Sequence, residues 1–250
     1  FLTQDGSSPA EIAALAKQQV DAYKTVRRIT GLVFHAERFN NEFLISLADG
    51  TTYRCSKLVF ATGIVDQWPE VRGFSECWGK TVLHCPYCHG YEVRGAKTGI
   101  LGNGDYAFEF ASLISNWTKQ LEIYTNGPST LTPHQTARLK THGISIVENR
   151  IDSLRHTNGY LEGISFTNGN LVDVNALYAR PAFKQSSELP QLLGCEMTEE
   201  GYIKVDALQR TTIPGVYACG DNVTKMRTVA NAISMGTTTA ITVNKDLILE

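Results

Sequence analysis

One stretch of the sequence constrains the fold more than any other: an apolar run that enters a glycine-rich turn and then a helix. The turn, residues 102–107, reads Gly-Asn-Gly-Asp-Tyr-Ala and fits the pattern G-x-G-x-x-A. In such a turn the first glycine permits the tight bend, the second lets the backbone approach a pyrophosphate, and the small third residue lets the helix pack on the strand. We therefore predict a dinucleotide-binding turn, whose candidate cofactor-binding residues are Gly102, Asn103, Gly104, Asp105 and Ala107.

The segments after this turn favour that prediction over a plain strand-to-helix turn, which the pattern alone would also fit. We expect a helix at about 105–117 and a strand at 121–125, then a helix at about 132–142 and a strand at 144–148. Strands that alternate with helices predict a parallel sheet with helices packed against it. The expected fold class is therefore α/β.

The end of the second strand lacks the residues that usually set nicotinamide specificity. A ribose-binding acid is expected there, roughly 20 residues after the turn. Thr125, Asn126 and Gly127 supply neither an acid nor an arginine cluster, and Glu122 is expected inside the strand. The sequence thus predicts the fold of a nicotinamide site and leaves NADPH, NADH or another electron source open.

The remaining sequence predicts a helix near each end and several strands between them. Ser8 is the expected N-cap of the first helix, with Pro9 at the first helical position and Glu11 three residues after the cap. That helix should end near Tyr23, and a final helix should begin near Thr228. The other expected β segments are runs at 32–39, 42–47 and 53–61 and a hairpin series at 154–166 and 171–178.

Composition excludes several classes of protein. A formal net charge of -2 over 250 residues provides no basic field, so we expect no nucleic-acid partner. No apolar run approaches the ~18 residues of a membrane span, so no membrane association is expected. Six cysteines are too few for a disulfide scaffold and fit a reducing, cytoplasmic compartment.

The string LHCPYCHGYE, residues 83–92, holds two cysteines and two histidines in six consecutive positions. Its C-x-x-C-H core has the form of a haem attachment site, half of a zinc site or a redox dithiol. We set the haem interpretation aside, because a dinucleotide-binding architecture around the motif would not use a haem. A zinc site usually takes its ligands from two separated pairs, and no second C-x-x-C or H-x-x-H pair exists in the chain. We therefore expect no metal and favour the dithiol.

A dithiol at Cys85 and Cys88 suits disulfide exchange. Three-residue spacing at the start of a helix brings two sulfurs within disulfide reach. The free amides there should stabilise a thiolate and lower its pKa. His89 is placed to carry a proton during exchange, with a structural or merely exposed histidine as the alternative. The other four cysteines are expected to be small core residues: Cys55, Cys77, Cys195 and Cys219.

Three motifs now stand in order along nearly the whole chain: FATG at 60–63, C-x-x-C ahead of the glycine turn, and IPGVYACGD at 213–221. This arrangement resembles the low-molecular-weight thioredoxin reductases and their flavoprotein relatives. The dithiol string is similar to the subgroup with the gliotoxin-type dithiol oxidases, because ordinary thioredoxin reductases usually have an acid where this chain has His89. The resemblance implies that Asp221 hydrogen-bonds the ribityl chain of FAD. The other flavin-binding residues that it implies are Gly63, Gly220, Arg227, Thr228 and Val229.

The resemblance also implies two Rossmann-like, three-layer nucleotide-binding domains. The FAD domain would be discontinuous, at 1–70 and 177–250, and the NAD(P)H-like domain at 71–176 would carry the dithiol. The first FAD βαβ unit of the family, with its own glycine turn, is expected before Phe1 and is absent, so we expect residue 1 to be a truncated or disordered boundary. The arginine run that binds the NADP phosphate in the family is missing too.

Two enzymatic functions and one non-enzymatic function follow from the resemblance. The first is a disulfide reductase that passes electrons from a nicotinamide through FAD and the dithiol to a thioredoxin-like protein or a small-molecule disulfide. The second is a dithiol oxidase that runs the opposite way, with oxygen as acceptor. The third is a flavin-binding module without catalysis, which the intact Cys85 and Cys88 argue against. By analogy with the family, Cys88 would face the flavin, Cys85 would exchange with the substrate, and the chain would form a homodimer.

Overall fold

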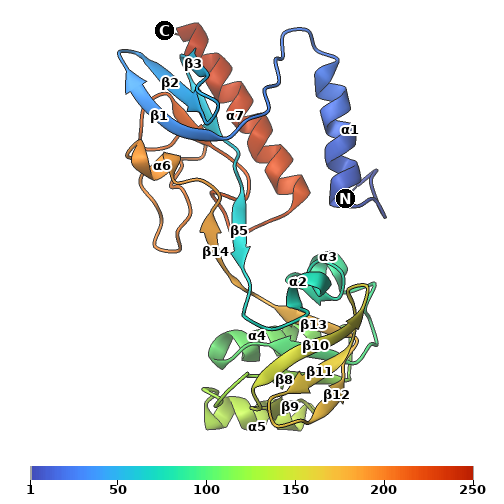
Figure 1. Ribbon diagram of the computed structural model, residues 1–250. Coiled ribbons are helices and arrows are strands. Elements are labelled where there is room, and N and C mark those ends of the chain that lie inside the picture. The colour runs from blue at the N-terminus through green and yellow to red at the C-terminus, as the bar shows by residue number, and fades with distance from the viewer. Residues whose placement is uncertain (1, 250) are drawn as a thin grey trace. The chain divides into compact units, whose positions relative to one another are not determined.

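The computed structural model describes residues 2–249 and divides into two compact units (Figure 1). Unit 1 runs to Val65 and resumes at Phe183, and unit 2 is Asp66–Ala182. The segments that connect the units are β5 (Ile64–Gln67) and β14 (Ala182–Gln185), which pair with each other. The predicted domain boundaries fall close by, at residues 70 and 176, whereas the assignment of each part to a cofactor is a proposal.

Unit 2 is built on the parallel sheet that the alternating sequence predicted. Its five strands lie in the order β6-β13-β7-β8-β9, and each neighbouring pair is parallel. The strands, in that order, are Val82–Leu83, Ala176–Ala179, Thr98–Leu101, Leu121–Tyr124 and Ser145–Val147. The α/β fold class is therefore confirmed.

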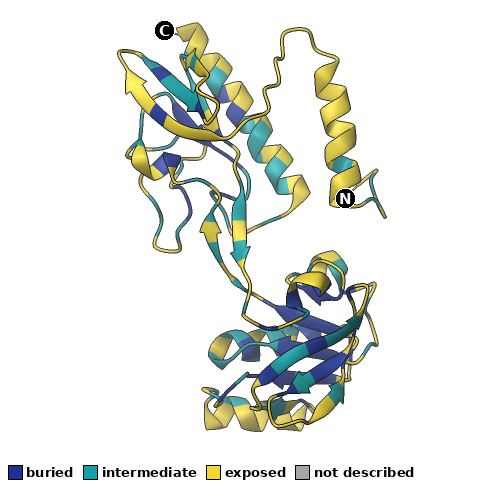
Figure 2. Cartoon of the chain, in the orientation of Figure 1, coloured by how far each residue is buried: buried dark blue, intermediate teal, exposed yellow. Residues whose placement is uncertain are grey.

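The two faces of this sheet carry different layers, so unit 2 has three layers. Alternate residues point to opposite faces of a strand: in β6, Val82 packs in one core cluster and Leu83 in the other. Helices α4 (Gly104–Ile114) and α5 (Pro133–Thr141) cover the Leu83 face. An antiparallel sheet covers the Val82 face, together with the short helix α2 (Phe74–Cys77). The strands of that antiparallel sheet are β10 (Ile151–Thr157), β11 (Tyr160–Phe166) and β12 (Leu171–Asp173). In unit 2, buried residues concentrate in the five-stranded parallel sheet (Figure 2).

Two of the predicted β segments are wrong in the same way: each contains two strands, and the two strands belong to different sheets. The run at 53–61 divides into β3 (Thr52–Cys55) and β4 (Leu58–Phe60), which belong to different sheets. The run at 171–178 divides into β12 and β13, of which only β12 continues the hairpin series. Strand β13 is buried at all four positions and pairs in parallel with β6 and β7. Local sequence does not encode which distant strand a segment will meet.

Unit 1 holds an antiparallel sheet and a separate parallel pair. The sheet contains β1 (Val33–Phe39), β2 (Glu42–Leu47) and β3, and the pair joins β4 to β15 (Val216–Ala218). Its core cluster includes Phe43, Ile203 and Ala218. Helix α6 (Leu189–Leu192) packs near β1.

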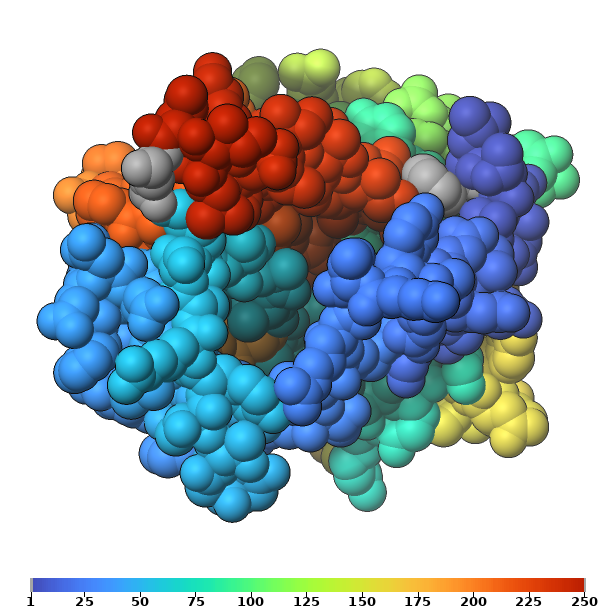
Figure 3. All heavy atoms as spheres, turned by 90° about the horizontal axis from the view of Figure 1, so that it is seen from above, coloured from blue at the N-terminus to red at the C-terminus, as the bar shows by residue number. Residues whose placement is uncertain are grey.

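The two long helices of unit 1 begin close to where the sequence predicted. Helix α1 (Pro9–Asp21) starts with the expected capping box, in which Ser8 and Glu11 bond each other's backbone amides, and it ends two residues before the predicted Tyr23. Helix α7 (Val229–Leu249) borders a hollow of the unit that is visible from above (Figure 3). No helix among the described residues is long and apolar enough to cross a membrane.

Candidate active site

The dithiol lies where a buried strand runs into a single helical turn. Strand β6 ends at Leu83, and α3 (Pro86–His89) follows. Cys85 is the N-cap of α3 in extended conformation, and Pro86 takes the first helical position, where no amide hydrogen is needed. Cys88 lies one turn on, with its Sγ 2.7 Å from Sγ of Cys85. The structure therefore brings the predicted pair of sulfurs together.

Cys88 does not have the lowered pKa that its helical position suggested. Protein atoms around its sulfur, and after them the adjacent Cys85 thiol, raise the pKa of Cys88 to about 12. Burial disfavours a charged sulfur, and two thiols in contact resist a second negative charge. Helix α3 is one turn long, so it has only a small dipole with which to oppose these effects. The prediction of a lowered thiol pKa is therefore wrong for Cys88 in the dithiol form.

The two histidines of the motif have different surroundings. The ring of His84 lies against Trp78, with centroids 6.1 Å apart. His89 is the half-buried last residue of α3, and its backbone amide donates to the carbonyl of Cys85 at 3.3 Å. Within residues 2–249, no group of three or more metal-binding side chains could hold a metal ion. Proton transfer by His89 stays a prediction.

Aromatic side chains flank the dithiol. A Cβ at Gly90 would lie 2.6 Å from Nε1 of Trp117, so glycine lets the turn after α3 approach that ring. Tyr87 lies edge-on to Trp117 with centroids 5.9 Å apart, and the guanidinium of Arg94 lies 3.8 Å from the ring centroid of Tyr91. Tyr87 and Tyr91 are 76% and 69% exposed. A substrate that reaches the sulfurs would therefore meet aromatic surface.

A groove of about 460 Å³ lies in unit 1, where β4 and β15 end and α7 begins. All six predicted flavin-binding residues line it: Gly63, Gly220, Asp221, Arg227, Thr228 and Val229. The rest of the lining is small or apolar, from Ala61, Cys219, Ala232 and Gly236. The structure thus gathers residues from two distant parts of the chain, 61–63 and 219–236, around one groove.

The groove fits a flat ligand that carries hydroxyl groups. Gly63 and Gly220 have φ of 65° and 87°, and a Cβ built at either would meet no atom within 4 Å, so a side chain there would project into free space. Beside the half-buried Asp221, Asn222 is fully buried, and its Oδ1 has no hydrogen-bond partner. Small residues and one carboxylate in the lining, with an unpartnered amide oxygen beside it, are consistent with FAD.

The glycine turn of unit 2 forms as predicted, but a side chain of the turn itself accepts the hydrogen bond of one of its backbone amides. Asn103 caps α4, and its Oδ1 accepts from the amides of Gly104 at 2.9 Å and Thr130 at 2.8 Å. Its Nδ2 donates to the carbonyl of Pro128 at 2.9 Å. A pyrophosphate at this turn would have to displace Asn103 from the Gly104 amide. The backbone has the expected form, but its donors are engaged.

A tyrosine ring also packs on this turn. A Cβ at Gly102 would lie 2.8 Å from Cε1 of Tyr106, whose hydroxyl is buried without a hydrogen-bond partner. Asp105 accepts from Nε2 of Gln135 at 2.7 Å. Ala107 is fully buried, as expected of the small residue that lets α4 pack on the strand. The turn fits a dinucleotide in shape and only partly in hydrogen-bonding capacity.

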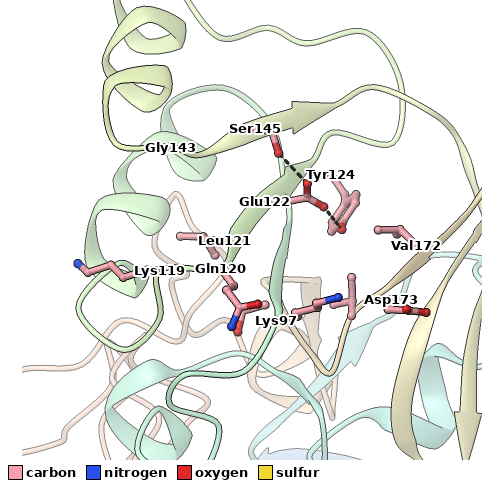
Figure 4. A pocket seen from close by; sticks show the side chains of 12 residues that line it. Lys97, Lys119, Gln120, Leu121, Glu122, Tyr124, Gly143, Ser145, Val172 and Asp173 are labelled. Atoms are coloured by element: carbon pink, nitrogen blue, oxygen red, sulfur yellow. Dashed lines mark hydrogen bonds between the residues drawn. The ribbon is translucent and has the colours of Figure 1, made fainter.

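Glu122 lies inside β8, as predicted, and its carboxylate is engaged. It accepts from the hydroxyl of Tyr124 at 2.7 Å and from that of Ser145 at 2.8 Å, in a pocket of about 270 Å³ (Figure 4). Asn126, at the strand end, accepts from the amide of Ile151 at 2.7 Å. Neither residue is placed as a ribose-binding acid, so the strand end carries no such group.

The parallel sheet with its glycine turn, the dithiol and the flavin-shaped groove together define a dinucleotide-dependent disulphide oxidoreductase. Over residues 3–236 the chain matches the pyridine nucleotide-disulphide oxidoreductase family, and it belongs to that family. FAD and NADPH are the cofactors of its thioredoxin reductases.

Named relatives agree with this assignment. Thioredoxin reductase tcpT of Claviceps purpurea is 31% identical over 247 residues, which cover 93% of this chain and 76% of the relative. Thioredoxin reductase aclD of Aspergillus oryzae is 29% identical and covers 83% of this chain and 69% of the relative. The crystal structure of an oxidoreductase from Agrobacterium tumefaciens is 29% identical, with a TM-score of 0.90 over 100% of this chain and 84% of that one.

Sequence reasoning missed three residues of these sites. Asn222 follows the recognised Asp221, and an amide in a buried turn was a signal that could have been used. Tyr106 lies inside the glycine motif, at a position that the pattern leaves free. Tyr178 is buried in β13 and carries no local signal, because its neighbours come from distant strands.

Proposed function

We propose that the protein is an FAD-dependent dithiol–disulfide oxidoreductase that works through Cys85 and Cys88. The observation that carries this proposal is the 2.7 Å contact between the two free sulfurs at the start of α3. Family membership supports it, as does the flavin-shaped groove in unit 1. Its substrates would be disulfides or dithiols, either on a thioredoxin-like protein or on a small molecule.

The exchange itself needs only the side chains of this chain and the substrate. The Cys85 thiolate attacks one sulfur of a substrate disulfide, so a mixed disulfide forms and the other substrate sulfur leaves and takes a proton. Cys88 then loses its proton and attacks Cys85, which releases the second substrate thiol and leaves a Cys85–Cys88 disulfide. The raised pKa of Cys88 keeps that thiol protonated until this second step. His89, one residue away, would take the proton.

The flavin groove would supply binding and orientation. Asp221 would accept hydrogen bonds from the hydroxyl groups of the ribityl chain, and Gly63 and Gly220 would let the backbone approach the ligand. Arg227, whose guanidinium lies 5.2 Å from the ring centroid of Phe183, would line the groove together with Thr228 and Val229. FAD, when bound, supplies two-electron chemistry that exchanges with the dithiol.

A second candidate function is a dithiol oxidase, and the glycine turn favours it. Asn103 holds the Gly104 amide and Tyr106 packs on Gly102, so the turn is poorly disposed to receive a nicotinamide dinucleotide. In this direction a substrate dithiol reduces the Cys85–Cys88 disulfide and becomes a disulfide itself. The two electrons and two protons finally pass to oxygen, which leaves as hydrogen peroxide.

We also propose a reducing, cytoplasmic compartment, because six cysteines in 250 residues are too sparse for a disulfide scaffold. By analogy with the family we expect a homodimer, whose state sedimentation or light scattering would measure.

Anaerobic reduction of the full-length, flavin-loaded protein tests the proposal and its direction together. NADPH, NADH and a small dithiol are mixed with the protein in turn, and the loss of flavin absorbance is followed by stopped flow. Rapid reduction by a nicotinamide supports the reductase, whereas rapid reduction by the dithiol alone supports the oxidase. If none of the three reduces the flavin, the proposed function is wrong.

A further inference from the structure

Tyr178 is a buried hydroxyl-bearing residue that the exchange described above does not use. It lies in the middle of β13 and is 1% exposed. Its hydroxyl has no hydrogen-bond partner among the described residues. A buried donor without a partner is rare, because it gives up its bonds to water and gains none in return. Phenylalanine would fill the same space without that loss, so we look for a function of the hydroxyl group.

The fold places Tyr178 beside the dithiol segment. Strand β13 pairs with β6, and Tyr178 is in register with Leu83, two residues before Cys85. Leu83 belongs to the same core cluster as Tyr178, and Val93, which follows α3, packs against that cluster. The segment that carries both cysteines therefore starts and ends on the cluster that contains Tyr178.

The electrostatics agree with this placement. Burial, and after it the charges of Cys85 and Glu92, together raise the pKa of Tyr178 to about 12. The phenol thus stays protonated at neutral pH and can act only as a donor to an anion. Its ring is held edge-on by Phe110, with centroids 5.8 Å apart, which limits where the hydroxyl can point.

In the dithiol form Cys85 has another donor. Cys85 already accepts from the Cys88 thiol at 2.7 Å. That donor is lost whenever the sulfur of Cys88 is covalently engaged or is itself ionised. A thiolate at Cys85 then needs a new donor, because it is half-buried and away from much of the solvent.

We propose that the Tyr178 hydroxyl donates to the Cys85 thiolate in the steps in which Cys88 is covalently engaged or ionised, and that it stabilises Cys85 there as a leaving group. Tyr178 is therefore a positioning residue for the dithiol. This proposal rests on the proposed function, because it assigns Tyr178 a role in dithiol exchange. The hydrogen bond itself can be tested without flavin and without substrate. The titratable groups near Cys85 are Cys88 and His89 on α3, His84 before it and Glu92 after it.

Alkylation of a single thiol tests this donor. In the full-length protein with Cys88→Ala, which removes the donor at position 88, the rate at which iodoacetamide modifies Cys85 is measured from pH 5 to 10, and the modified peptide is identified by mass spectrometry. The same measurement is made after adding Tyr178→Phe. We expect the pH midpoint of the reaction to rise by about one unit, which makes the reaction about tenfold slower at neutral pH.

Tyr106→Phe is the matched control, since it also removes a buried hydroxyl without a partner from unit 2 and leaves the ring in place. It should leave the midpoint unchanged. An unchanged midpoint in Tyr178→Phe, or an equal shift in both variants, overturns the proposal. Circular dichroism checks that both variants fold. As a second measurement, the glutathione equilibrium of the intact Cys85–Cys88 pair should favour the disulfide more in Tyr178→Phe than in the parent, and no change there would also count against the donor.

Discussion

Asn222 ties the end of β15 to the end of β4, because its Nδ2 donates to the carbonyl oxygen of Phe60 at 2.9 Å. The same Nδ2 lies 3.3 Å from Oγ1 of Thr62. The two strand ends also carry Gly63 and Asp221, which line the flavin groove. One buried amide therefore holds both walls of the groove in register.

Replacing Asn222 with alanine should loosen these walls. Loss of a buried hydrogen bond to a carbonyl typically lowers stability by about 1–2 kcal/mol. We expect Asn222→Ala to lower the unfolding free energy by about that amount and to retain less flavin, as measured by urea unfolding and by flavin content after dialysis. Thr62→Val, which removes only the longer contact, should have a smaller effect. Equal flavin content in Asn222→Ala and the parent would contradict this role.

Asp221→Ala should weaken FAD binding without unfolding the chain. A hydrogen bond to a charged group contributes about 1.5–3 kcal/mol, so the dissociation constant of FAD should rise about 10- to 100-fold. Fluorescence titration of the apoprotein measures it. The control is Asp173→Ala in unit 2, which removes a 72% exposed carboxylate that pairs with Arg155. If both variants bind FAD as the parent does, Asp221 is not a flavin ligand.

Serine variants of the two dithiol cysteines should block exchange at different steps. In Cys88→Ser the second step of exchange is blocked, so a mixed disulfide with a model disulfide should accumulate on Cys85 and appear by mass spectrometry. In Cys85→Ser little mixed disulfide should form at neutral pH, because the protein atoms around the Cys88 sulfur, the largest cause of its raised pKa, remain in this variant and keep the thiolate scarce. Trapping on Cys88 alone would reverse the roles. Unimpaired turnover in both variants would end the dithiol proposal.

The network around Asp246 should make unit 1 sensitive to acid. Arg210 donates to both oxygens of this carboxylate at 2.9 and 2.7 Å, and the Tyr217 hydroxyl donates at 2.7 Å. Arg210 and then Tyr217 lower the pKa of Asp246 to about 2. The folded pKa lies below the unfolded one, so the stabilisation is present above about pH 4 and is lost as pH falls towards 2.

Asp246→Asn should therefore be less stable than the parent at pH 6, and the two proteins should converge as the pH approaches 2. Guanidinium unfolding at several pH values measures this. Lys204→Ala, which removes a surface pair with Glu196, should run parallel to the parent over the same range. A constant gap between Asp246→Asn and the parent at all pH values would show that the ionised carboxylate is not the cause.

NADPH and NADH should be poorly discriminated. The strand end at Thr125, Asn126 and Gly127 offers no arginine for a 2′-phosphate and no acid for a 2′-hydroxyl, and Asn126 is bound to Ile151. We expect the two affinities to lie within about tenfold, which corresponds to ~1.4 kcal/mol. Titration of the apoprotein with each dinucleotide measures this ratio. Strong selectivity for NADPH would contradict this interpretation of the strand end.

The sequence by itself determined the features that depend on near neighbours. The capping box at Ser8 and Glu11, the turn at Gly102–Ala107 and the position of Cys85 at a helix start were all predicted, because each is fixed by contacts within a few residues. The family resemblance also named six residues that line one groove of unit 1, and their contact with FAD stays a prediction.

Only the tertiary structure decided how distant segments share a site. The run at 53–61 and the run at 171–178 each supply two sheets, because hydrogen-bonding partners far along the chain select the strands. The pKa of Cys88 is raised rather than lowered: although the residue is exposed, the protein atoms close to its sulfur and the neighbouring thiol outweigh a one-turn helix. Tyr178 reaches the dithiol segment only through the parallel pairing of β13 with β6, a contact between residues 178 and 83 that no local pattern contains.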